Sequence, residues 1–111
     1  MKIVKFKKNK ILDESAKCTL VTEIDFDEDS KKPINFCVLL LFQSGEIIYE
    51  IIKYDGTHRS CHVHKYYEKL NSIGESCLPS QINSKSITCF KDDVKANWKS
   101  YVAAYRKKLK I

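Results

Sequence analysis

The chain has 111 residues, 43% of them hydrophobic, and a formal charge of +6 from 20 basic and 14 acidic side chains. This length predicts a single domain over residues 1–111, because two independent cores need more chain. The apolar content favours a packed core over disorder. The longest apolar run, residues 38–42, is far shorter than the roughly 20 residues of a membrane span, so no membrane association is expected.

The basic charge predicts attraction to polyanions, and RNA is the commonest polyanion in a cytosol. Only two of the basic residues are arginines, so phosphates would mostly meet lysine ammonium groups. A solvated lysine surface without a partner is the alternative interpretation.

The cysteines and the N-terminus indicate an intracellular protein. Lysines interrupt the apolar residues of MKIVKFKKNK, which therefore lacks the continuous apolar region of a signal peptide. The five cysteines are odd in number and form no C-x-x-C pair, which argues against a disulfide framework and a zinc knuckle. We expect a cytoplasmic protein with buried free thiols.

The first half of the chain alternates apolar and polar residues with the period of two that is typical of β-strands. We expect four to five strands, at residues 2–6, 17–26, 34–42, 46–54 and 60–67. The predicted connections are a turn near Asn9, a charged loop at 27–33, a tight turn at QSGE (43–46) and a turn at DGT (55–57). Short connections of this kind predict an antiparallel meander.

The second half predicts a surface loop and a helix. Residues 71–86 are rich in Ser, Asn, Gly and Pro, as loops are. Residues 90–109 place seven apolar side chains on one helical face: Phe90, Val94, Trp98, Tyr101, Val102, Tyr105 and Leu109. Acidic residues would fall in the first turn and basic residues in the last, as the helix dipole favours: Asp92, Asp93, Arg106, Lys107 and Lys108. The predicted fold class is α+β, a twisted antiparallel β-meander of four to five strands packed against one long C-terminal helix.

All three histidines lie within seven positions, in the segment KYDGTHRSCHVHKYY (53–67). Residues two apart on a strand share a face, which places His62 and His64 together, with Tyr66 on the same side. Cys61 and Val63 would form the core side. We therefore expect the two imidazoles to project away from the helix, about 7 Å apart at their bases.

This arrangement suits the metal-independent cleavage of RNA. The reaction needs a base for the 2′-hydroxyl and an acid for the leaving 5′-oxygen, and the ordinary pKa of histidine, about 6.5, suits both. We predict His62 and His64 as the acid–base pair, Asp55 as the group that orients an imidazole, and His58 as a further catalytic candidate. The predicted phosphate contacts are Arg59 and Lys65, with Lys53 as an alternative. The residues predicted to stack on bases are Tyr54 and Tyr66, with Tyr67.

Two alternatives remain at this point. His62 and His64 with Asp55 or His58 resemble a two-histidine, one-carboxylate metal set, but the spacing singles out no firm third ligand, so we predict no cofactor. The other alternative is a non-catalytic module that binds RNA or a protein at an open sheet edge.

The motif Tyr54-Asp55, then a short turn, then His62-Val63-His64 resembles the TumE family of small prokaryotic toxins, the toxin partners of two-gene toxin–antitoxin modules. The strand order before the motif and the helix after it are also similar. The resemblance implies a toxin that acts on RNA or translation, with a cognate antitoxin as its partner. It implies roles only for Asp55, His62 and His64. A homodimer formed by pairing of the exposed sheet edges is a further alternative.

Overall fold

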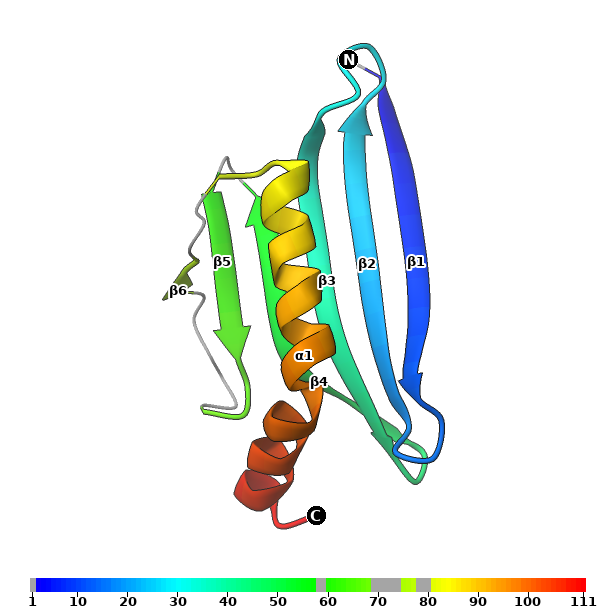
Figure 1. Cartoon of the computed structure of the whole chain (residues 1–111), viewed down its shortest axis with the longest axis vertical. Helices are drawn as coiled ribbons and strands as arrows, with labels where there is room; N and C mark the ends of the chain where they lie inside the picture. Colours follow the sequence, from blue (N-terminus) through cyan, green and yellow to red (C-terminus); the bar gives the residue numbers. More distant parts are fainter. Residues whose placement is uncertain (1, 58–59, 69–74, 78–80) are drawn as a thin grey trace.

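One antiparallel sheet and one long helix make up the described part of the chain, residues 2–57, 60–68, 75–77 and 81–111 of a computed structural model. Six strands pair in the order β1-β2-β3-β4-β5-β6, and the helix packs on one face (Figure 1). The elements are β1 (Ile3–Asp13), β2 (Cys18–Asp27), β3 (Pro33–Ser44), β4 (Ile47–Thr57), β5 (Ser60–Lys65), β6 (Glu75–Ser76) and α1 (Ser84–Leu109). The predicted fold class is confirmed, with a short sixth strand in addition.

Strand β3 lies in the middle of the sheet because its apolar residues can be buried on both sides. Its side chains that face the helix are fully buried: Phe36, Val38, Leu40 and Phe42. The predicted turn at 43–46 is confirmed. Gly45 has a positive φ of 61°, which glycine adopts without steric cost, and the strands rejoin with Ser44 opposite Ile47.

Two predicted turns lie inside strands. Asn9 is paired with Val21 in the middle of β1, and the hairpin turn follows Asp13, whose carboxylate accepts a hydrogen bond of 2.8 Å from the backbone of Ala16. Gly56 lies within β4, where a Cβ would collide with the ring of Phe36. The glycine at position 56 therefore indicates close packing of a side chain on the strand rather than a turn.

The helix begins earlier than predicted, at Ser84, so the last residues of the predicted loop are helical. Asn83 is the N-cap, and its side-chain oxygen accepts a hydrogen bond of 2.8 Å from the backbone N–H of Ser86. The first turn consequently holds no acidic residue, and the predicted placement of Asp92 and Asp93 there is wrong. The basic last turn is confirmed.

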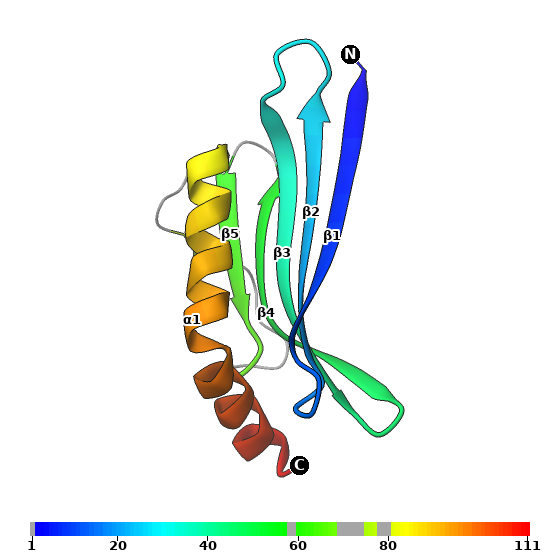
Figure 2. The same ribbon diagram turned by 45° about the vertical axis from the view of Figure 1, so that its right-hand side comes forward.

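Helix α1 crosses β2, β3 and β4 on one side of the sheet (Figure 2). The predicted apolar helix face meets the sheet residues there, and the sheet and helix side chains form one core. Its members include Leu20, Leu40, Ile52, Phe90, Val94 and Val102. Within the described residues, no helix combines the length and the apolar character needed to cross a bilayer.

Asp93 forms the polar link between the helix and the sheet. Its carboxylate accepts a hydrogen bond of 2.6 Å from the hydroxyl of Tyr54 on β4 and one of 2.7 Å from Tyr101, two helical turns further on. The ring of Tyr54 stacks on Phe90 at a centroid distance of 4.4 Å. Burial, and then the hydrogen bond to Asp93, raise the pKa of both Tyr54 and Tyr101, so both phenols keep the protons that they donate.

We expect Asp93→Ala to lower the free energy of unfolding by about 2–4 kcal/mol, because two tyrosine hydroxyls lose a charged acceptor. Urea denaturation measures this value. Asp92→Ala removes the neighbouring, exposed carboxylate and should change stability by less than about 0.5 kcal/mol. Equal destabilisation by the two variants would contradict the link.

The raised pKa values of Tyr54 and Tyr101 also predict a loss of stability in alkaline solution. An unfolded tyrosine releases its proton near pH 10, whereas these two retain theirs while the protein is folded. Their contribution is therefore complete below about pH 10 and decreases above it, by up to about 1.4 kcal/mol per pH unit and per tyrosine. Tyr54→Phe should show a shallower decrease between about pH 10 and 12 in urea titrations. A slope equal to that of the wild type would contradict this assignment.

Candidate acid–base site on the open face of the sheet

The strand pairing places the candidate residues on the face opposite α1. In the β4–β5 pair, Asp55 lies opposite His62 and Lys53 lies opposite His64. Cys61 is 1% exposed, on the helix side, whereas both histidines are only half-buried. The predicted alternation along this strand is therefore observed, and the two imidazoles share the open face.

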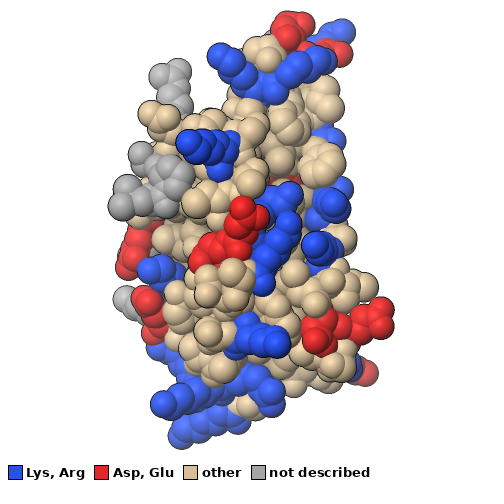
Figure 3. Space-filling view, in the orientation of Figure 1, with Lys and Arg blue, Asp and Glu red and all other residues tan. Residues whose placement is uncertain are grey.

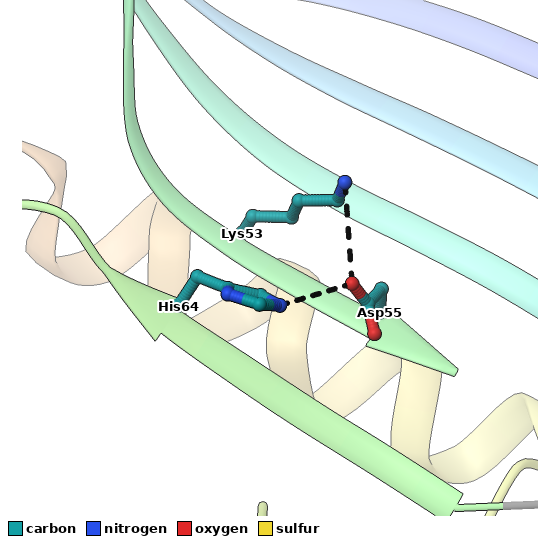
Figure 4. A network of polar contacts seen from close by, with 3 residues as sticks. All are labelled: Lys53, Asp55 and His64. Carbon is teal, nitrogen blue, oxygen red and sulfur yellow. Dashed lines mark ion pairs between the residues drawn. The ribbon is translucent and has the colours of Figure 1, made fainter. Parts of the chain in front are cut away.

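Asp55 is the centre of a small polar network. Its Oδ2 lies 3.3 Å from Nε2 of His64 and 4.0 Å from Nζ of Lys53 (Figure 4). The contact with His64 is diagonal, because the residue directly opposite Asp55 is His62. The side chain of Asp55 is 18% exposed and that of His64 is 21% exposed. Partial shielding from water strengthens such a contact relative to one on the open surface.

The ring of Tyr66 borders the network. It stacks against His64 at a centroid distance of 5.9 Å and an interplanar angle of 15°. Burial raises the pKa of Tyr66, so its hydroxyl stays neutral at physiological pH. The carboxylate of Asp55 and this ring together hold the imidazole of His64. On the other side, His62 lies in register with Ser76 of β6.

Two of the predicted site residues, Tyr54 and Lys65, lie on the helix side of the sheet and not in this network. Tyr54 points to the helix side, where its ring packs on Phe90 and its hydroxyl binds Asp93; its predicted role in base stacking does not fit this position. Lys65 pairs in register with the buried Ile52, on the helix side of the sheet. The two remaining predictions, His58 and Arg59, lie outside the described residues.

The structure adds Cys37, which sequence analysis did not select. Cys37 lies on β3 directly opposite Asp55, on the same face. Burial raises the pKa of its thiol to about 11. The group is therefore protonated at neutral pH, and a thiol is a poor nucleophile compared with a thiolate. No sequence pattern indicates this neighbour, because it depends on the register between β3 and β4.

Elsewhere on the open face, two lysines of β1 form ion pairs with carboxylates of β2. Lys7 lies 3.6 Å from Glu23, and Lys5 lies 3.7 Å from Asp25. A shallow hollow of about 180 Å³ begins there and extends to Cys37, one strand away from Asp55. A larger cavity of about 410 Å³ lies near the β1–β2 and β3–β4 hairpins, and none of the predicted site residues that the structure describes line it.

Metal binding was the open alternative at this site. Across residues 2–57, 60–68, 75–77 and 81–111, no group of three or more His, Cys, Asp or Glu side chains is arranged to hold a metal ion. The chemistry that this geometry offers is proton transfer at imidazoles next to a carboxylate and an ammonium group.

The fold and the site define a small α+β protein with a polar network on its open sheet face. Residues 7–111 match the family model described as "Domain of unknown function (DUF7718)", and the chain belongs to this family. No match was found among curated proteins or among solved structures. The family description names no activity, so the resemblance to TumE toxins stays a prediction.

Proposed function

We propose that this protein is an acid–base catalyst that cleaves RNA without a metal ion, as the toxin of a toxin–antitoxin module. The observation that carries the proposal is the contact of 3.3 Å between Asp55 and His64, with His62 next to them on the same open face. A carboxylate beside an imidazole stabilises the imidazolium that forms when the ring accepts a proton.

The proposed reaction assigns one proton transfer to each imidazole. His64 accepts the proton of the 2′-hydroxyl while the 2′-oxygen attacks the adjacent phosphorus. The bond from phosphorus to the 5′-oxygen breaks, and His62 donates a proton to that leaving oxygen. The products are a 2′,3′-cyclic phosphate and a 5′-hydroxyl. Two residues of separation along a strand, roughly 7 Å, allow both rings to reach one phosphate group.

The substrate contacts follow from the residues that the structure brings together. Lys53 replaces Lys65 as the phosphate contact, because its ammonium group lies 4.0 Å from Asp55 on the open face. Tyr66 stays as the stacking residue beside His64. The role as a toxin rests on the resemblance of Asp55, His62 and His64 to the TumE motif, and on the positive charge of the chain.

We expect His62→Ala and His64→Ala each to lower the rate of RNA cleavage in EDTA by about 100- to 10,000-fold, the usual contribution of a general acid or base. Asp55→Asn should lower it by about 100-fold, because the amide does not stabilise an imidazolium. Gel analysis of a labelled RNA measures these rates.

Asp29→Asn is the matched control, since Asp29 is an exposed carboxylate in the β2–β3 hairpin; its rate should equal that of the wild type. Equal cleavage by the wild type and both histidine variants would reject the proposed acid–base pair. Cleavage that disappears in EDTA for the wild type would reject metal independence.

The outer edge of β1 favours a second function, the binding of a partner protein. β1 is an 11-residue edge strand, and four of its apolar side chains are 44–59% exposed: Ile3, Val4, Phe6 and Ile11. An open edge of this kind pairs with a strand of another chain. β1 also carries four lysines, which would oppose one another in a homodimer and favour an acidic partner strand. The cognate antitoxin is the expected partner.

We expect Val4→Asp with Phe6→Asp to weaken binding of the protein encoded by the neighbouring reading frame at least about tenfold, through lost apolar contact and added like charge. Isothermal titration calorimetry measures this affinity. Ile47→Asp with Ile48→Asp is the control, because these two apolar side chains are also exposed, in the β3–β4 hairpin away from β1. Similar weakening by the two double variants would argue against docking at β1.

A further inference from the structure

Four lysines that form no ion pair within the described residues lie together on the helix side of the sheet, on the opposite face from His62 and His64. A groove runs between α1 and strands β1 and β2, and Figure 3 shows Lys and Arg atoms gathered along this boundary. We call it the lysine groove; its walls are Lys8, Lys10, Lys91 and Lys95, and its floor is Leu20 and Thr22.

Two periodicities bring the four lysines together. Lys8 and Lys10 share the helix-facing side of β1, where their register partners are the buried Thr22 and Leu20. Lys91 and Lys95 lie one helical turn apart. Burial, followed by the charges of Lys95 and Lys8, lowers the pKa of Lys91. The neighbouring charge of Asp92 opposes this lowering in part, and like charges that line one hollow repel one another.

The two faces of β1 differ in how this positive charge is balanced. On the open face, β2 supplies Glu23 and Asp25 to the lysines of β1. On the helix face, β2 supplies Leu20 and Thr22 at the corresponding positions. In the part of the chain that the structure describes, no carboxylate lines the lysine groove or forms an ion pair with its four lysines. An anion from outside the chain would relieve the repulsion.

We infer that the lysine groove binds the phosphate groups of a nucleic-acid strand. Its cavity of about 40 Å³ has room for a few water-sized groups, which suits a phosphate group rather than a base. Along the groove, the lysines follow one another at roughly 6–7 Å on each element, so successive phosphates are contacted. Among the residues that the structure describes, no aromatic side chain lines the groove, and lysine contacts to phosphate carry no sequence preference.

This inference goes beyond the proposed function, because the groove and the histidine site lie on opposite faces of the sheet. Binding in the groove holds an RNA strand through its backbone whether or not the chain cleaves it. The test is therefore made in a His62→Ala, His64→Ala background, where cleavage does not alter the probe. An absence of cleavage would therefore not change the result for RNA binding, and an absence of binding in the groove would not change the result for cleavage.

The experiment measures fluorescence anisotropy of a labelled single-stranded RNA at several salt concentrations. Lys91→Gln with Lys95→Gln should weaken binding about tenfold at physiological salt. It should also reduce the slope of log K against log salt by about 1–2, since each lost contact to a single strand contributes about 0.7. Lys8→Gln with Lys10→Gln, on the other wall, should have the same effect and guards against a variant that fails to fold.

Lys31→Gln with Lys32→Gln is the matched control, because it removes the same charge from the exposed β2–β3 hairpin; it should weaken binding less than about twofold. Equal weakening by the control and the groove variants would overturn the inference. Displacement of the RNA by poly-glutamate of equal charge would reassign the groove to acidic proteins. Displacement by inorganic phosphate at low concentration would reassign it to small phosphate ligands. Both of these outcomes overturn binding of a nucleic-acid strand.

Discussion

The structure depends on the attachment of α1 to one face of the sheet, and Asp93 is the polar residue that fixes it. Its carboxylate accepts hydrogen bonds from Tyr54 on β4 and from Tyr101 on the helix itself, within an otherwise apolar contact. Because both tyrosine hydroxyls donate to the Asp93 carboxylate, few positions of the helix on the sheet satisfy both hydrogen bonds. Because side chains on a strand alternate between faces, the face covered by α1 also decides that Asp55, His62 and His64 lie on the open face of the sheet.

The covered and open faces then acquire different electrostatic characters. On the open face, Lys5 and Lys7 of β1 pair with Asp25 and Glu23, and Lys53 lies 4.0 Å from Asp55 beside the Asp55–His64 contact. On the helix side, the described residues that line the lysine groove include four lysines and no carboxylate. The proposed acid–base chemistry and the proposed binding of RNA therefore use separate surfaces of one small sheet.

Local patterns predicted much of the fold, and they failed where packing overrides them. The meander and the long amphipathic helix follow from periods of two and 3.6 residues. Gly56 resembled a turn residue next to Asp55, but it lies inside β4 because Phe36 occupies the space of its side chain. The helix start was missed because the segment from Ser84 is polar in composition, whereas the cap at Asn83 and the burial of Ile87 stabilise it.

In the candidate site, too, some features follow from local sequence patterns and others depend on packing. The shared face of His62 and His64 was predictable from the amino-acid order, because alternation is a local property of any strand. Packing was needed to show that Asp55 contacts His64 diagonally, that Tyr54 belongs to the core, and that lysines from β1 and α1 line one groove. Those contacts depend on strand register and on which face the helix covers, and both are settled by packing between segments far apart in the chain.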